Sequence, residues 1–152
     1  MNQPFNKDKV VVITGGAKKI GRATAKKLAE QGFNILIHTG GKSVEEAKKT
    51  VAIVKEYGVQ SDFVDGDLVG EDKEKIKSLV AAEKLGTPSV LINNAGLRIH
   101  DDFEKITYED WKKVMTVNVD ASFLCTQALI GHMTKQKWGR VINIGGLSAH
   151  IG

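Results

Sequence analysis

The segment TGGAKKIG, which runs from Thr14 to Gly21, constrains the fold of this chain more than any other stretch. It follows the apolar run VVVI at positions 10–13 and precedes RATAKKLAEQG, in which apolar and small residues recur at helical spacing. A short apolar run that ends in glycines is typical of a buried strand, and the second pattern is typical of an amphipathic helix. We therefore predict that the glycine-rich segment is a turn that joins a buried strand to a helix.

The same alternation of strand and helix continues along the chain. Apolar runs predict four more strands at residues 33–38, 61–67, 88–96 and 139–146. Between them, helices are predicted at 20–31, from 43 to about 58, at 71–85, and from 107 to about 136 with room for a bend near Asn118. Because the strands are continuously apolar, each should be buried on both faces. This predicts an α/β fold with a doubly wound parallel sheet and helices on both sides.

Two helix starts carry capping signals. Ser43 is a candidate N-cap, and Glu46 stands three residues later, which is the spacing of a capping box. Thr107 begins the last helix, with Glu109 and Asp110 in its first turn, where the helix dipole favours acids.

Composition limits the class of protein. The 152 residues, 41% hydrophobic and 26% charged, suit one ordinary globular domain. The single cysteine, Cys125, excludes an intrachain disulfide and is expected to be a small buried residue. The N-terminal residues lack the apolar core of a signal peptide, and no apolar run approaches membrane-spanning length. These features favour a cytoplasmic protein without a membrane partner.

Charge and ligand-type residues exclude two further classes. The net charge is +4, but the lysines are interleaved with acids on helices and form no basic run with aromatic residues. Nucleic acid is therefore not an expected partner. His100 lies next to Asp101 and Asp102, but no second histidine or cysteine stands at ligand spacing, so we expect no metal site.

In doubly wound sheets, ligands bind beyond the carboxyl ends of the strands. After the first strand, Gly15 and Gly16 let the backbone approach a phosphate, and the following helix N-terminus favours an anion. Lys18 and Lys19 add positive charge there. The alternative is a plain strand-to-helix turn, but the position between the first strand and the first helix favours a phosphate site.

The ends of the next strands indicate which dinucleotide is bound. The loop HTGGKS at 38–43 contains no acid for ribose hydroxyls, while Lys42 there and Lys18 in the turn suit a 2′-phosphate. We therefore predict NADP rather than NAD, with a purely solvent-exposed Lys42 as the alternative. A carboxylate of the segment Asp65–Asp67 suits an adenine amino group, and the small residues of NNAG at 93–96 leave room for a flat ring.

At these positions the sequence resembles the short-chain dehydrogenase/reductase family, in particular its 3-oxoacyl-acyl-carrier-protein reductase-like branch. TGGAKKIG stands where the family has Thr-Gly-x-x-x-Gly-x-Gly, Asp67-Leu68 matches the adenine-contacting acid, and NNAG matches the third signature. VMTVNV places Asn118 at the family's catalytic asparagine, and GRVINI at 139–144 matches the strand that leads to the catalytic serine. The five motifs follow in order at the family's spacing, over essentially the whole chain.

The resemblance implies a Rossmann-type sheet with five of the expected seven strands, in one NAD(P)-binding domain at residues 1–152. It implies hydride transfer between NADP and a small-molecule carbonyl or alcohol. In the family, a tyrosine is the general acid, a lysine lowers its pKa, a serine holds the substrate oxygen and an asparagine anchors a relay water. Catalytic roles carry over to Asn118 and Ser148. Cofactor binding carries over to Thr14, Gly15, Lys18, Lys19, Ile20, Gly21, Lys42, Asp67, Leu68, Asn94, Ala95 and Gly96.

Three departures from the family's pattern bear on this reading. Lys19 replaces the middle glycine of the turn, as a basic residue does in pteridine-reductase-like members, and should reinforce the phosphate site. Gly146 stands where the serine is expected, so Ser148 substitutes only if the loop is reshaped; otherwise it is an ordinary loop serine. The Tyr-x-x-x-Lys pair is absent from its expected place. Tyr108 and Lys112 have the spacing but are interpreted as a helix-surface pair.

We therefore expect a chain with the cofactor half and the start of the active site, without the Tyr/Lys helix, the substrate lid and the last two strands. Such a chain should be inactive alone and should leave the fifth strand as an exposed edge. The leading hypothesis is an NADP-dependent oxidoreductase or its cofactor-binding portion, and the alternative is a non-catalytic dinucleotide-binding module. A hydrolase built on Ser148 and His150 lacks an acid and a nucleophile elbow.

The helix after the fourth strand has apolar residues on more than one side, among them Phe123 and Ile130. One side should pack on the sheet. The other suits a homo-oligomer contact, as the resemblance also implies, unless both sides are buried within one chain.

Overall fold

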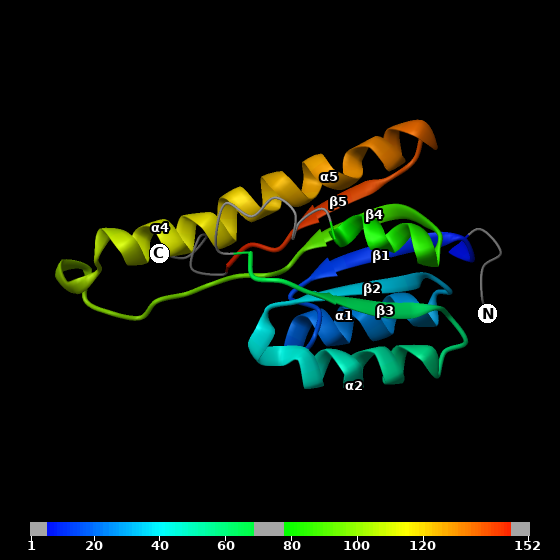
Figure 1. Cartoon of the computed structure of the whole chain (residues 1–152), viewed down its shortest axis with the longest axis horizontal. Coiled ribbons are helices and arrows are strands. Elements are labelled where there is room, and N and C mark those ends of the chain that lie inside the picture. Colours follow the sequence, from blue (N-terminus) through cyan, green and yellow to red (C-terminus); the bar gives the residue numbers. More distant parts are fainter. Residues whose placement is uncertain (1–5, 69–77, 147–152) are drawn as a thin grey trace.

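The computed structural model describes residues 6–68 and 78–146. Its strands form one parallel sheet in the order β3-β2-β1-β4-β5, which confirms the predicted doubly wound α/β fold (Figure 1). Each strand lies where an apolar run predicted it, with ends that differ by a few residues. The strands are β1 Lys9–Thr14, β2 Asn34–Thr39, β3 Ser61–Asp65, β4 Thr87–Asn93 and β5 Arg140–Asn143.

The helices lie on both faces of the sheet, with α1 and α2 on one side and α5 on the other (Figure 1). Two α-helices of 12 residues follow β1 and β2, close to their predicted bounds. The segment before β4 differs from its prediction, because its described residues form a 3-10 helix rather than an α-helix. The helical elements are α1 Lys19–Glu30, η2 Gly41–Ser43, α2 Val44–Lys55, η3 Ser78–Leu85, η4 Phe103–Lys105, α4 Tyr108–Met115, η5 Thr116–Asp120 and α5 Ala121–Lys135.

Strand side chains divide between two apolar layers, because successive residues of a strand point to opposite faces. Val11, Ile13, Ile35 and Ile37 pack with buried residues of α1 and α2. The neighbouring positions face the other layer, which contains buried residues of η3 and α5; its strand members are Val10, Val12, Leu36 and Leu91. The continuous apolar runs of β1 and β2 therefore reflect burial on both faces.

The two edge strands depart from that rule. All four residues of β5 are exposed, and β3 is only partly buried. The expectation that every strand is buried on both faces is therefore wrong for β5 and β3, because the two apolar layers include no residue of β5 and only the partly buried Phe63 and Val64 of β3. Among the described residues, β5 is an edge strand of the sheet, as expected.

The helical stretch after β4 contains the predicted irregularity. A π-helical turn, η5, separates α4 from α5 and contains Asn118. A π-helical turn inside an α-helix is frequently found at a functional site. The Asn118 side chain donates to the Leu97 carbonyl at 2.9 Å and accepts from the Leu97 amide at 2.8 Å, so it ties this turn to the loop after β4.

By length and composition, the continuous stretch Tyr108–Lys135 is apolar enough to span a membrane, which the sequence analysis did not identify. The core helix of a soluble protein passes the same test. In this structure Ala121, Cys125 and Leu129 are buried in the layer formed with the sheet. Packing on the sheet therefore accounts for one apolar side of the helix, and the expectation of a buried Cys125 is confirmed.

Of the two predicted capping signals, the one at α4 is confirmed and the one at α2 is not. Thr107 and Asp110 form a reciprocal capping box at the start of α4. At the start of α2, Ser43 makes no side-chain capping bond, so the expected box is absent. Glu46 instead pairs with Arg22 of α1 and Lys49, because these cations lie within 2.7 Å of its carboxylate.

The packing of α5 on the sheet generates a stability prediction. Leu129 is fully buried, so Leu129→Ala should lower the free energy of unfolding by about 2–5 kcal/mol through lost burial and a residual cavity. Gln127→Ala, an exposed position on the same helix, should change it by less than about 0.5 kcal/mol. Urea unfolding followed by circular dichroism measures both. Equal effects of the two substitutions would contradict the packing of α5.

Candidate functional site

The sheet order places a topological switch point beside β1. The chain moves from β1 outward to β2 and β3, and then crosses to β4 on the other side of β1. Ligands of open α/β sheets bind at the carboxyl edge of the strands at such a point. The turn Thr14–Gly21 and the loop after β4 meet there, so the predicted phosphate turn lies at the expected edge of the sheet.

Thr14 and Asn94 hold the two sides of the switch point together. The Thr14 hydroxyl accepts hydrogen bonds from the amides of Asn94 and Ala95, both at 3.0 Å. The Asn94 side-chain amide donates to the carbonyls of Thr14 and Gly15 at 3.0 and 3.1 Å. These bonds fix the loop after β4 against the turn after β1.

The glycines of the turn are required by its geometry. Gly15 has φ +64°, and a Cβ atom on it would lie 3.0 Å from the Ala95 Cα. A Cβ atom on Gly21 would lie 2.4 Å from the Gly15 carbonyl oxygen, so only glycine fits. Lys19 adopts φ 51°, in the left-handed region that glycine favours. The backbone conformation thus retains the family's glycine position even though the residue is lysine.

The turn and the neighbouring loop present positive charge to solvent. Lys18 and Lys19 are exposed at the start of α1, and Lys42 is exposed in η2. Among the ion pairs of the described residues, none involves these three lysines. The first turn of α1 contains no acid, and its leading amides lack intrahelical partners. Together these groups form a site that suits an anion.

The ends of β2 and β3 form the next part of this edge. His38 is buried, and its Nε2 lies 2.7 Å from the Gly66 carbonyl oxygen, which links the two strand ends. Burial lowers the pKa of His38, so the ring is neutral. Its Nε2 is the protonated nitrogen, because it donates a hydrogen bond to the Gly66 carbonyl oxygen. Asp67 is exposed just beyond this link, and Leu68 is buried beneath it. An exposed carboxylate thus lies at the predicted adenine position.

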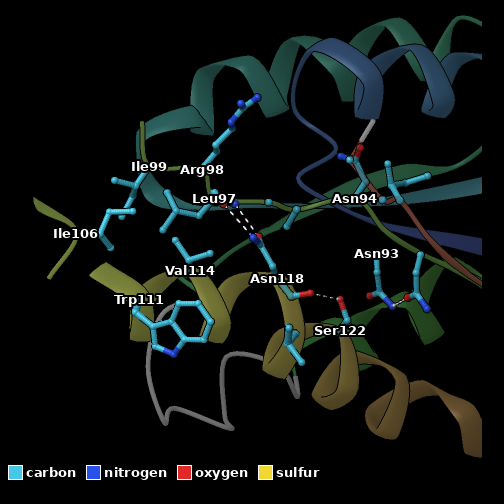
Figure 2. A pocket seen from close by; sticks show the side chains of 17 residues that line it. Asn93, Asn94, Leu97, Arg98, Ile99, Ile106, Trp111, Val114, Asn118 and Ser122 are labelled. Carbon is cyan, nitrogen blue, oxygen red and sulfur yellow. Dashed lines mark hydrogen bonds between the residues drawn. The ribbon is translucent and has the colours of Figure 1, made fainter. Parts of the chain in front are cut away.

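A pocket of about 1070 Å³ opens on the other side of the switch point (Figure 2). It lies between the loop after β4, the end of β5 and the continuous helical stretch Tyr108–Lys135, which we call the long helix. Its wall is largely apolar and includes Trp111 and Val114. Polar groups come from Asn118, Ser122 and Asn143. Ala95 and Gly96 line the side nearest the turn. This combination of an apolar wall and a few polar groups is typical of a small-molecule site.

Asn118 is oriented by its neighbours in this pocket. Both polar atoms of its side chain are engaged by Leu97 (Figure 2). Its backbone carbonyl oxygen accepts a long hydrogen bond, at 3.4 Å, from the Ser122 hydroxyl. The structure therefore fixes the Asn118 backbone beside the pocket.

The structure brings together most of the predicted site residues, but not all. Thr14, Gly15, Lys18, Lys19, Ile20, Gly21, Asn94, Ala95 and Gly96 lie at the switch point, and Lys42, Asp67 and Leu68 lie at the ends of β2 and β3. Gly146 lines the pocket, and Ser148 lies outside the described residues. Tyr108 is 72% exposed with the Lys112 ammonium 5.0 Å from its ring centroid, which is consistent with a helix-surface pair.

Two residues that shape this edge were missed from the sequence. Asn143 accepts from the Asn93 side chain at 2.8 Å and so joins the ends of β4 and β5. A polar residue inside the apolar run VINI was its available signal. Arg22 bonds to the turn and to α2, and no local pattern identifies it, because its partners lie 24 or more positions away except for Ala17.

Comparisons with known proteins agree with this geometry. The family model for short chain dehydrogenases matches residues 9–152. The 3-oxoacyl-[acyl-carrier-protein] reductase FabG of Aquifex aeolicus is 36% identical over 150 residues, covering 95% of this chain and 58% of that protein. An NAD⁺-bound xylitol dehydrogenase superposes with a TM-score of 0.86 at 29% identity, covering 99% of this chain and 57% of the other. A blue fluorescent protein from a metagenomic library, in complex with NADPH, gives 0.84 at 29% identity, covering 99% and 60%.

The chain thus spans a little over half the length of the proteins it matches. The match nevertheless extends from the start of β1 through the glycine turn, the Thr14–Asn94 link and the Asn118 helix to the end of the chain. The chain therefore belongs to the short-chain dehydrogenase family.

Proposed function

We propose that this chain is the cofactor-binding portion of an NADP-dependent oxidoreductase that transfers hydride between the cofactor and a small-molecule carbonyl or alcohol. The observation that carries the NADP preference is the set of exposed cations at the carboxyl edge, Lys18, Lys19 and Lys42, with no described acid paired to them. A 2′-phosphate needs such cations, whereas a bare ribose is usually bound by an acid. The two structures above bind NAD⁺ and NADPH respectively, so both cofactors occur among similar proteins.

The residues present fit a dinucleotide. The turn Thr14–Gly21 would hold the pyrophosphate, because its glycines admit a close approach and the α1 N-terminus offers amides. Asp67 with Leu68 would hold the adenine, and Asn94, Ala95 and Gly96 would hold the nicotinamide side. When bound, NADP supplies or accepts the hydride; the protein's part is to hold it and to manage the proton.

On the substrate side, we propose that Asn118 anchors a relay water through its backbone, because its side chain is hydrogen-bonded to the backbone of Leu97. The pocket beside it would take the substrate, and the proposed serine role falls to Ser148. Among residues 1–152, the one Tyr-x-x-x-Lys pair is Tyr108 and Lys112 on the surface of α4. Family membership favours this reading over a non-catalytic binding module.

We further propose that the protein is cytoplasmic and forms a homo-oligomer. Phe123, Val119 and Ile130 on the long helix are 64%, 51% and 44% exposed, on the side of the helix away from Cys125 and Leu129. An apolar helix face of this kind suits a contact between copies of the chain.

The cofactor preference generates the first test. NADPH should bind more tightly than NADH, and Lys18→Glu or Lys42→Glu should weaken NADPH about tenfold or more while changing NADH less, because each reverses a charge at the 2′-phosphate. Fluorescence titration with each nucleotide measures this. Lys84→Glu, an exposed lysine before β4 at the opposite edge of the sheet, makes the same charge change and should leave both affinities unaltered. Equal affinities in the unmutated chain would rule out the preference.

Catalysis by the 152-residue chain is a separate question. We expect it to bind NADPH without oxidising it in the presence of short-chain ketones or 3-oxoacyl thioesters, because the one Tyr-x-x-x-Lys pair of residues 1–152 lies on the surface of α4. The absorbance of NADPH over time measures turnover. Ketone-dependent oxidation that Asn118→Ala abolishes would contradict the expectation, and oxidation that survives the substitution would indicate a contaminating enzyme.

The oligomer contact is tested at its most exposed residue. Phe123→Glu should shift the sedimentation profile from oligomer towards monomer, since a charge in an apolar contact carries a large desolvation cost. Lys55→Glu, on α2 at the opposite face of the sheet, provides the control and should leave the profile unchanged. A monomeric unmutated chain would refute a homo-oligomer of this polypeptide.

A further inference from the structure

Arg22 of α1 forms a hydrogen-bonded junction between two segments that the proposed cofactor site uses. Its Nε donates to the Thr50 hydroxyl at 2.7 Å, and its Nη2 donates to the Ala17 carbonyl at 2.8 Å. The same Nη2 lies 2.7 Å from a carboxylate oxygen of Glu46 and 3.1 Å from the Glu46 carbonyl. One guanidinium therefore joins the glycine turn to the first turn and the middle of α2.

The junction is partly buried, on the side of Thr50 and Ala17. Thr50 is fully buried, Ala17 is 2% exposed, and the Arg22 side chain is 26% exposed. The Thr50 hydroxyl also lies 2.7 Å from the Ala17 carbonyl oxygen, so the two α-helices meet at one acceptor in the turn. A planar guanidinium with several fixed donors maintains such a multi-point contact, whereas a lysine ammonium on a flexible stem does not.

The charge of Arg22 is committed to this junction. Glu46 is its partner, and hydrogen bonds from Lys49 and then Arg22 lower the pKa of Glu46 to about 2. The carboxylate therefore stays ionised below its ordinary pKa of 4.5, and its contribution to stability is lost as the pH falls from about 4.5 towards about 2. By contrast, Lys18 and Lys42 have no ion-pair partner among the described residues and are left for an anionic ligand.

The positions of the partners connect the junction to those two lysines. Ala17 immediately precedes Lys18 in the turn, and Glu46 follows Lys42 by four residues through η2 and the start of α2. No hydrogen bond between the described parts of the turn and of η2 links them directly. Arg22 is thus one of the links between the Lys18 segment and the Lys42 segment, together with the Thr50 bond to Ala17 and the Gly16 amide bond to the His38 carbonyl.

We propose that Arg22 is a positioning residue for cofactor selection: it holds the turn Thr14–Gly21 against the start of α2 so that Lys18 and Lys42 act on the same 2′-phosphate. The proposal rests on the proposed function, because it assumes that NADP binds at this edge. Arg22 itself does not contact the cofactor; it acts through the spacing of the two lysines.

The test compares the NADPH and NADH affinities of Arg22 variants by fluorescence titration, well below the thermal unfolding midpoint of each variant. Arg22→Ala should weaken NADPH about tenfold and NADH no more than about threefold, because loss of preorganisation affects the two-lysine contact most. Arg22→Lys should recover stability more than selectivity, since it restores the charge opposite Glu46 but not the multi-point contact. Lys27→Ala removes one surface ion pair on the same helix and should leave both affinities unchanged.

A purely structural role gives a different result. Arg22→Ala would then lower the thermal unfolding midpoint, but the folded protein would keep the same ratio of NADPH affinity to NADH affinity. That result overturns the proposal. If Arg22→Ala does not fold, Glu46→Ala decides, because Glu46 is 37% exposed and its loss breaks the side-chain tie to α2 while retaining Arg22. If Glu46→Ala lowers the ratio of NADPH affinity to NADH affinity, the proposal is supported; if the ratio is unchanged, the proposal is refuted. If the unmutated chain binds neither nucleotide, the proposed function itself fails.

Discussion

The hydrogen bonds between Thr14 and Asn94 connect the two halves of this sheet at its ligand-binding edge. Neither β1 nor β4 ends freely: the Thr14 hydroxyl accepts from two amides of the loop after β4, and the Asn94 side chain returns two bonds to the turn after β1. Polar groups in a partly buried position are costly to leave unpaired, so this reciprocal set favours one arrangement of turn and loop. This link therefore positions both the turn Thr14–Gly21 and the part of the pocket wall formed by the loop after β4.

Around it, the structure separates two tasks. The side with α1 and α2 provides exposed cations and free helix amides, which suit phosphate groups. The side with the long helix provides an apolar wall and a π-helical turn that fixes Asn118 against the loop after β4. A dinucleotide lying across the switch point would meet both environments, charged at one end and apolar at the other, which matches the chemistry of its two halves.

Much of this could be predicted from local patterns. Apolar runs identified the strands, and for β1, β2 and β4 these runs reflect burial on both faces. The turn was recognisable because Gly15 and Gly21 stand where no side chain fits. The failures arose where neighbours decide the outcome. Burial of β5 was overestimated because the two apolar layers do not include it. At the start of α2, Ser43 makes no capping bond and the Glu46 carboxylate pairs with Arg22 and Lys49 instead.

The sequence by itself determined the order of strands and helices, the parallel sheet and the place of the glycine turn, since these depend on residue spacing and on backbone conformations open only to certain residues. It also determined which groups stand at the strand ends. Only the tertiary structure decided how those groups meet: that Arg22 joins the turn to α2, that Asn143 pairs with Asn93, and that Leu97 occupies the Asn118 side chain. Apart from the Arg22–Ala17 bond, each of these contacts joins residues more than 20 positions apart, and their distances follow from packing of whole elements, which no local pattern encodes.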